Sequence, residues 1–224
     1  MGAAKCMIKG SDYIGVFAAA TEKYVFLGNG IERRARDIVT GALKVLPIEL
    51  TMFATDMVGL FVKGNSNGLL LSNLMDEREI DVLKKYDLDM NVEIMESGLN
   101  AIGNNILVND KIAIINPDYS HESRKQIADV LGVEVIEQEI GGFKTVGAND
   151  ILTNNGLVIN NRATDQQKEA IDKIVGFDSV RTTANTGSLN IGISTISNSR
   201  GVVVGGNTTG FELTRITDGL EIND

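Results

Sequence analysis

The chain has 224 residues and a formal net charge of −9, from 21 Lys and Arg residues against 30 Asp and Glu residues. That sign excludes a protein that holds nucleic acid mainly through phosphate contacts, and it suits a basic protein surface as partner. No stretch of about 18 apolar residues could span a membrane, and the start lacks the apolar run of a signal peptide. We therefore expect one cytoplasmic domain over residues 1–224.

Five copies of an Ile/Val–Gly pair begin five repeats near residues 14, 58, 102, 146 and 191. We call their glycines the anchor glycines: Gly15, Gly59, Gly103, Gly147 and Gly192. Successive anchor glycines are 44, 44, 44 and 45 residues apart, a period typical of an array of one supersecondary unit. After each one, an apolar run, a turn rich in Asn, Asp, Ser and Gly, and a second apolar run predict a β-hairpin.

A helix and a third strand complete each repeat. In the second to fifth repeats, a preferred N-cap residue lies seventeen positions after the anchor glycine. In three of these repeats Glu or Gln follows three positions later, as in a capping box. These pairs are Asp76 with Glu79, Thr164 with Gln167 and Thr209 with Glu212, while Ser120 is the fourth cap. The first repeat has Glu32 at the cap position, before a helical pattern over 33–44. A final β-rich run, such as 92–95 or 133–136, makes the unit strand–strand–helix–strand.

The two ends of the chain are out of phase with the repeat. The fifth copy has a helical pattern near 209–217 and almost no chain left for its last strand, whereas residues 3–9 precede the first repeat. An open array would need polar end caps, and a sheet with a missing strand would leave an exposed edge. We therefore predict an α/β fold: a five-fold pseudo-symmetric αβ propeller, closed by the N-terminal strand.

Catalytic and metal sites are not expected. Cys6 and His121 are the only Cys and His residues, so two or more such ligands for one metal ion are unavailable. A Cys–His pair could in principle form a nucleophile and its base. However, Cys6 falls in the ring-closing strand and His121 in the first turn of the third helix, where a solvated side chain is the expected state. We expect no catalytic residues, no cofactor and no metal.

Several motifs, taken in order, resemble the translation initiation factor 6 family. They are Gly64–Leu70 (GNSNGLL), Ala101–Asn104 followed by Asn109-Asp110, Val146-Gly147 followed by Thr153–Gly156, and Asn185–Ser188 with Thr208–Leu213. The likeness covers residues 8–222, and the short C-terminal end resembles the archaeal members. The family often has Pro after the second strand; Pro117 keeps it, whereas Asn73 and Asn161 replace it in other copies.

The resemblance implies a pentein-type propeller that is a ribosome anti-association factor and not an enzyme. Such a factor binds the intersubunit face of the large ribosomal subunit and blocks joining of the small subunit. The implied partners are a ribosomal protein of that face, universal protein L14, and the nearby sarcin–ricin loop of the ribosomal RNA. The resemblance also implies roles in translation initiation and large-subunit maturation. A closed ring leaves no edge for pairing, so we expect a monomer.

Two alternatives remain open at the level of sequence. A guanidino-group-modifying enzyme of the same propeller superfamily would need a Cys nucleophile, a His base and carboxylates converging at the ring centre. An acidic scaffold for another basic protein would agree equally well with the composition.

Binding candidates follow from the pseudo-symmetry. Residues that directly follow the anchor glycines should form a circle on one face: Val16, Leu60, Asn104, Ala148 and Ile193. Asn104 is polar and lies within the Ala101–Asn104 motif that resembles the family, and Leu60 is its neighbour in the adjacent repeat. We expect Leu60, Asn65 and Asn104 to be the ribosome-binding candidates, with Asn65 also supporting the hairpin.

Overall fold

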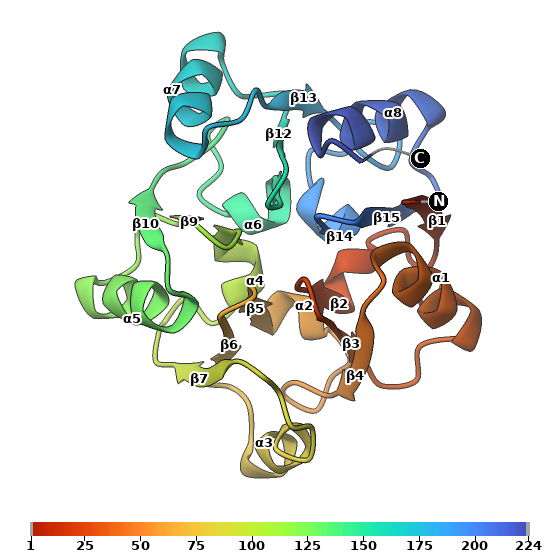
Figure 1. Cartoon of the computed structure of the whole chain (residues 1–224), viewed down its shortest axis with the longest axis vertical. Coiled ribbons are helices and arrows are strands. Elements are labelled where there is room, and N and C mark those ends of the chain that lie inside the picture. The colour runs from red at the N-terminus through yellow and green to blue at the C-terminus, as the bar shows by residue number, and fades with distance from the viewer. Residues whose placement is uncertain (1, 223–224) are drawn as a thin grey trace.

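The computed structural model describes residues 2–222. Five three-stranded sheets radiate from a central axis as the blades of a propeller, and the two ends of the chain lie next to each other (Figure 1). The predicted propeller of strand–strand–helix–strand repeats is confirmed.

Each blade has an inner, a middle and an outer strand. The inner and middle strands are antiparallel, as the predicted hairpins require, and the outer strand is parallel to the middle one. Blade 1 contains β2 (Ala18–Ala20), β3 (Tyr24–Gly28) and β4 (Leu46–Leu50), and blade 2 contains β5 (Val62–Gly64), β6 (Gly68–Ser72) and β7 (Asn91–Met95). Blade 3 contains β8 (Ile106–Val108), β9 (Ile112–Ile115) and β10 (Glu134–Glu137), and blade 4 contains β11 (Ile151–Leu152), β12 (Leu157–Asn160) and β13 (Val180–Thr182).

Blade 5 is built from both ends of the chain. Its inner and middle strands are β14 (Thr195–Asn198) and β15 (Gly201–Gly205), and its outer strand is β1 (Ala3–Cys6). β1 runs parallel to β15 with Ala3 opposite Val202 and Cys6 opposite Gly205. The prediction that the N-terminal segment closes the ring is therefore confirmed, with a strand shorter than the expected 3–9.

Five outer helices begin where the sequence predicts. They are α1 (Arg33–Leu43), α3 (Glu77–Leu83), α5 (His121–Leu131), α7 (Asp165–Val175) and α8 (Gly210–Gly219). The side chains of Asp76, Thr164 and Thr209 each accept a hydrogen bond from the N3 backbone, and all three capping boxes are complete. Glu32 makes no such bond, which agrees with the first repeat being the least regular.

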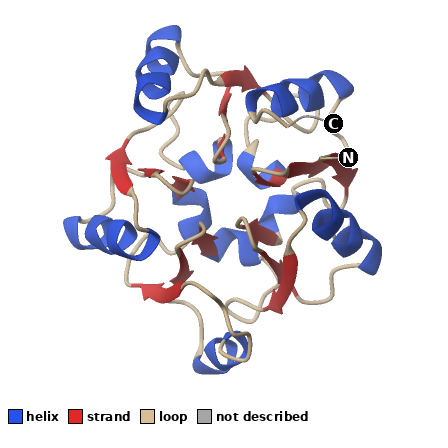
Figure 2. Cartoon of the chain, viewed as in Figure 1, coloured by secondary structure: helices blue, strands red, loops and turns tan. Residues whose placement is uncertain are grey.

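A second, inner set of short helices was not predicted. Each anchor glycine lies in a single helical turn beside the axis, so that Figure 2 shows an inner and an outer ring of helices. Turns of three or four residues contain too few positions for a helical period to be visible in sequence. The inner set comprises η1 (Ile14–Val16), α2 (Val58–Phe61), α4 (Ile102–Asn105), α6 (Val146–Asn149) and η2 (Gly192–Ser194).

The hydrophobic core consists of five clusters, each of which spans two neighbouring blades. One cluster, for example, joins Ile196 and Val203 of blade 5 to Val25 and Leu27 of blade 1, under Val39 of α1. Because each blade buries its apolar side chains against the next, the closed ring leaves no blade without a partner. Within residues 2–222, no helix combines the length and the apolar character needed to cross a membrane.

Candidate functional site

The five anchor glycines form a closed ring around the axis. A methyl group on Gly59 would overlap the carbonyl oxygen of Gly15, and the same relation links Gly103 to Gly59 and Gly147 to Gly103. A methyl group on Gly192 would likewise overlap the carbonyl oxygen of Gly147, and one on Gly15 would overlap that of Gly192. These contacts complete the circle. Glycine is required at these positions because backbone approaches backbone, and any side chain would force the blades apart.

The residues after the anchor glycines lie around this ring, as the pseudo-symmetry predicts. Val16, Leu60, Asn104 and Ile193 are partly exposed, whereas Ala148 is buried. Leu60 and Asn104 come from adjacent blades, and the backbone of Leu60 lies directly against Gly103. The structure therefore brings the two candidates together at one end of the propeller, which we call the glycine end.

Asn104 has an unused hydrogen-bonding group. Its side-chain Oδ1 is buried and has no hydrogen-bond partner, and the same holds for Oδ1 of Asn100 in the loop that leads into α4. By contrast, the neighbouring Asn105 donates its Nδ2 to the carbonyl of Ala101 at 2.9 Å. A buried amide oxygen without a donor costs free energy, so Asn100 and Asn104 are the polar groups of this loop that the fold leaves unsatisfied.

The loop before α2 presents an aromatic side chain from a strained backbone. Phe53 and Ala54 both have φ of 54°, in the left-handed region that residues other than glycine rarely adopt. Their N–H groups donate to the two carboxylate oxygens of Glu79 at 3.0 and 2.9 Å, which holds the turn in place. As a result, Phe53 is 60% exposed.

Blade 5 repeats this arrangement with a second buried carboxylate. The N–H groups of Thr186 and Gly187, both at positive φ, donate to Glu212 near the start of α8. Burial alone would raise the pKa of Glu212, but hydrogen bonds from Thr183, Thr209 and Gly187 hold that pKa at about 2. Glu212 is therefore ionised at neutral pH and fixes the loop before η2.

Several large apolar side chains are exposed in the loops that enter the inner helices. Tyr13 and Met57 directly precede η1 and α2, and Phe53 lies four residues before Met57. Each middle strand runs back toward the anchor glycines, and the outer strand is parallel to it. The loop that follows an outer strand therefore starts at the glycine end. Exposed apolar groups that lie close together are typical of a protein-binding surface, and these three residues supply such groups at the glycine end, although Leu46 and Val92 are exposed at the opposite end.

The opposite end, which we call the turn end, uses its polar side chains within the protein. Asn65 is only 4% exposed. Its Nδ2 donates to the carbonyls of Asn109 at 3.0 Å and Leu131 at 2.9 Å, and its Oδ1 accepts from the backbone of its own turn. Asn65 thus supports the hairpin, as expected, but lies at the other end of the propeller from Leu60 and Asn104.

One carboxylate beside the glycine end is buried within its blade. Asp150 follows α6, and its Oδ1 accepts hydrogen bonds from the backbone N–H and Nδ2 of Asn160 at 2.8 and 3.0 Å. Its Oδ2 is buried without a partner. Burial raises the pKa of Asp150 to about 7, although the two Asn160 bonds act in the opposite direction.

Cys6 and His121 do not meet. Cys6 is buried in β1 of blade 5, and His121 is exposed at the start of α5 in blade 3, across the ring (Figure 1). Burial raises the pKa of the Cys6 thiol to about 11, with the Glu32 carboxylate adding to the effect. The thiol is therefore protonated at neutral pH and unsuited to nucleophilic attack.

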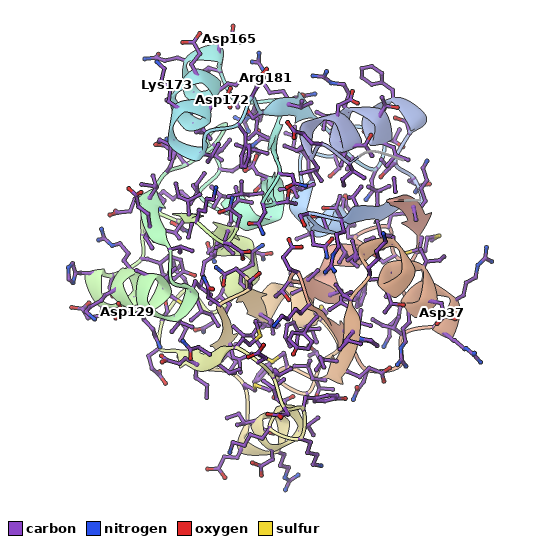
Figure 3. All side chains as sticks on the ribbon, in the orientation of Figure 1. Asp37, Asp129, Asp165, Asp172, Lys173 and Arg181 are labelled. Carbon is purple, nitrogen blue, oxygen red and sulfur yellow. The ribbon has the colours of Figure 1, made fainter. Side chains whose placement is uncertain are left out.

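Charged side chains concentrate on the outer helices and strands. Figure 3 labels Asp37, Asp129, Asp165, Asp172, Lys173 and Arg181, all at the rim of the propeller. Ion pairs such as Arg181 with Asp165 and Lys125 with Asp129 join neighbours there. Over the part of the chain that the structure describes, no three Cys, His, Asp or Glu side chains converge as metal ligands would.

Comparison with known proteins identifies relatives along the whole chain. Translation initiation factor 6 of Thermococcus onnurineus is 34% identical over 224 residues, which cover 98% of this chain and 98% of that protein. The protein of the same name from Pyrococcus horikoshii is 34% identical over 214 residues, or 94% of each chain. That from Methanococcus maripaludis is 33% identical over 225 residues and covers 98% and 99%.

Solved structures give more distant similarities. A DDAH from Pseudomonas aeruginosa, complexed with citrulline, is 15% identical with a TM-score of 0.45 and covers 76% of this chain and 69% of that one. The N-terminal domain of ArgZ, a cyanobacterial arginine dihydrolase, is 20% identical with a TM-score of 0.41 and covers 59% and 51%.

The family assignment rests on the sequence relatives. The model of the eIF-6 family matches residues 3–219, which is nearly the whole chain. The resemblance indicated by the motifs is confirmed, and the chain belongs to the eIF-6 family.

Proposed function

We propose that this protein binds the large ribosomal subunit at its intersubunit face and prevents premature joining with the small subunit by occupying space there. The observation that carries the proposal is membership of the eIF-6 family over residues 3–219, with full-length relatives named translation initiation factor 6. By this proposal the protein is a non-enzymatic factor of translation initiation and large-subunit maturation.

The architecture suits steric exclusion. A body that blocks subunit joining must resist compression, and in the closed ring each blade packs its apolar side chains against a neighbour on both sides. The glycine ring adds backbone contact around the whole axis. Small movements of one blade are therefore opposed by both its neighbours.

We place the binding surface at the glycine end, around Leu60 and Asn104. Three features support this choice: partly exposed apolar residues around the ring, exposed aromatic side chains in the adjoining loops, and the unpartnered acceptors of Asn100 and Asn104. A basic protein surface would supply both the donors and the complementary charge. Universal protein L14 is the partner proposed for this contact, with the sarcin–ricin loop nearby.

The enzymatic alternative lacks its geometry. A guanidino-modifying site needs its thiol, imidazole and carboxylates close together, whereas Cys6 and His121 lie in different blades and neither lines the centre. The thiol also has a raised pKa. No contact in the structure favours the acidic scaffold over the ribosome-binding factor.

The test uses two variants and two matched controls. Leu60→Asp and Asn104→Arg should each weaken binding to purified large subunits by about thirtyfold or more, which corresponds to the ~2 kcal/mol of an interface hot spot. Leu46→Asp and Asn91→Arg make the same changes at exposed positions of the turn end and should leave affinity unchanged.

Affinity is measured by co-sedimentation with large and with small subunits, and subunit joining by light scattering. Thermal melting of each variant confirms that it is folded. Binding to the small subunits alone would overturn the proposed function. Unchanged affinity in both glycine-end variants, with loss in the controls, would move the binding surface to the turn end.

A further inference from the structure

A surface pocket of about 620 Å³ opens beside α3 in blade 2. Its apolar lining comes from α3, the loop after it, β6 and β7, and consists of Leu71, Ile80, Leu83, Leu88, Val92 and Ile94. The volume lies within the range of roughly 300–1,000 Å³ that is usual for binding sites. α3 lies at the rim of the propeller, away from the axis (Figure 1). We call this site the blade 2 pocket.

The early end of α3 accounts for the pocket. α3 has 7 residues, whereas α1, α5 and α7 have 11 and α8 has 10. Ten positions after the start of each longer helix, an apolar side chain packs against the core: Leu43, Leu131, Val175 and Leu220. In blade 2 this position lies beyond the end of α3 and holds the exposed Asp87. Blade 2 therefore lacks the apolar side chain that the other four blades have there.

Neighbouring side chains cover the space only in part. Tyr86 and Leu88, in the loop after α3, pack against the core of blade 2 but remain partly exposed, and the same holds for Ile80 and Ile94. Val92 in β7 is 38% exposed. Apolar surface that stays in contact with water costs free energy, so a large apolar side chain from another molecule would be stabilised in this pocket.

The chain segment that builds the pocket is acidic. Residues 76–96 include α3, the loop after it and β7, and they carry eight Asp and Glu residues against three Lys and Arg residues. This short segment thus contributes −5 of the net charge of −9. A partner segment with positive charge would be attracted to it.

Charges at the edge of the pocket have the same net sign. Lys84 forms an ion pair with Asp81 at 3.2 Å, which offsets its charge. Lys85 then faces two carboxylates, those of Asp87 and Glu93, which are exposed and form no ion pair within residues 2–222. A cation beside the apolar opening would therefore find a carboxylate to pair with.

From these observations we propose that the blade 2 pocket docks a basic amphipathic segment of a partner protein. One large apolar side chain of that segment fills the place left by the short α3, and adjacent Lys or Arg side chains pair with Asp87 and Glu93. An apolar anchor in a pocket with charged groups around it is the usual form of a binding hot spot. Amphipathic helices are recognised in grooves in this way.

The blade 2 pocket does not rest on the ribosome-binding proposal. The loop after α3 leads to the start of β7, so the pocket opens toward the turn end, whereas Leu60 and Asn104 lie at the glycine end. The two surfaces share no residue, and both could be occupied at once. Failure of one proposal would leave the other intact.

The experiment uses an acetylated Leu/Lys peptide of about 14 residues, with Leu on one helical face and Lys on the other, and a Leu/Glu peptide of the same pattern. Affinities are measured by calorimetry on the full chain. Val92→Trp places an indole in the pocket and should weaken binding of the Leu/Lys peptide about thirtyfold. The matched control Ile174→Trp, at a 41% exposed position of α7, should leave it unchanged.

Charge is tested by a second pair of variants. Asp87→Lys should weaken binding of the Leu/Lys peptide about threefold to tenfold, and more at low salt, whereas Glu169→Lys on exposed α7 should not. Thermal melting confirms that each variant is folded. Methyl NMR of the wild-type protein needs no variant: signals of Ile80, Leu83 and Val92 should shift during the peptide titration.

Methyl shifts at these residues, with weaker binding to Val92→Trp only, would support the site. Equal affinities of wild type and folded Val92→Trp, or no binding at about 1 mM peptide, would overturn it. Equal binding of the Leu/Glu peptide would overturn the basic partner. A dimer of this chain that Val92→Trp dissociates, seen by sedimentation, would assign the pocket to a second copy and also overturn the proposal.

Discussion

The two ends of the propeller hold their blades together by different means. At the glycine end, neighbouring blades meet backbone to backbone through the ring of anchor glycines. At the turn end, side-chain amides bridge the blades: Asn65 to the Asn109 carbonyl, Asn109 to that of Thr153, and Asn198 to that of Thr21. Shape complementarity closes one end, and directed hydrogen bonds close the other.

This difference bears on where a partner can bind. The glycine contacts need no side chains, so residues around them, such as Leu60 and Asn104, keep groups available for another molecule. The side-chain amides of the turn end are already hydrogen-bonded within the protein. The turn end has few unsatisfied polar groups, so a partner gains few new hydrogen bonds there. The glycine end has acceptors without donors, so a partner can gain more.

Opening the ring should weaken both ends at once and have the largest effect. Deleting residues 2–9 removes β1 and the buried Ile8, and it exposes the edge of β15. We expect a loss of ~5 kcal/mol or more in the free energy of unfolding, from the lost ladder and apolar burial. Thermal and denaturant unfolding measure it; a truncated protein that melts within about two degrees of the full chain would contradict closure by β1.

A single substitution can disrupt the contacts of the glycine end without changing those of the turn end. Gly59→Ala places a methyl group against the backbone of Gly15, and we expect a loss of ~3 kcal/mol or failure to fold. The matched control is Gly41→Ala in exposed α1, where no atom lies within 4 Å of the added group. Because alanine favours helix, the control should gain up to ~1 kcal/mol. Similar effects of the two changes in denaturant unfolding would count against the glycine ring.

The turn end should be the more tolerant of the two. Asn65→Ala removes two inter-blade hydrogen bonds and leaves the buried carbonyls of Asn109 and Leu131 without that donor. We expect a cost of about 2–3 kcal/mol in the free energy of unfolding. Asn155→Ala removes one inter-blade bond, to the Ser199 carbonyl, and should cost about 1 kcal/mol. Equal losses would show that the Asn65 bonds are not additive.

A pH titration distinguishes two buried carboxylates of the glycine end. The pKa of Asp150 is raised to about 7, so the folded state holds this proton more tightly than the unfolded state. The protonated Asp150 contributes fully to the free energy of unfolding below about pH 4, and this contribution is lost as pH rises to about 7. Asp150→Asn should therefore be more stable than wild type above pH 7, by up to ~4 kcal/mol, and equal to it near pH 4.

Glu212 provides the comparison of opposite sign. Its pKa is held at about 2, so its contribution is present above the ordinary Glu pKa and is lost as pH falls toward 2. Glu212→Gln should thus destabilise the protein at neutral pH and converge with wild type in strong acid. Melting curves of both variants from about pH 2 to about pH 8 test the pair. Parallel curves for Asp150→Asn and wild type would refute the raised pKa.

Hairpins and helix starts could be read from the sequence because each depends on local chemistry, and repeat length because one unit recurs at a fixed spacing. The turn residue Asn65 accepts hydrogen bonds from the backbone of Asn67 and Gly68 in its own turn. The caps at Asp76, Thr164 and Thr209 bond within four residues. The missing fifth strand was visible because chain length and repeat phase together left no other place for residues 3–9. The circle of residues after the anchor glycines followed from the same pseudo-symmetry.

Contacts between blades were decided by the tertiary structure alone. The sequence did not reveal the inner helical turns, the backbone contacts between glycines or the placement of Asn65 at the far end from Asn104. Nor did it show that Lys63 lines the central cavity or that the acceptors of Asn100 and Asn104 are unpartnered. The inner turns are too short to show a helical period. The contacts between blades join groups 44 or more residues apart, and no local propensity encodes which of them meet once the ring closes.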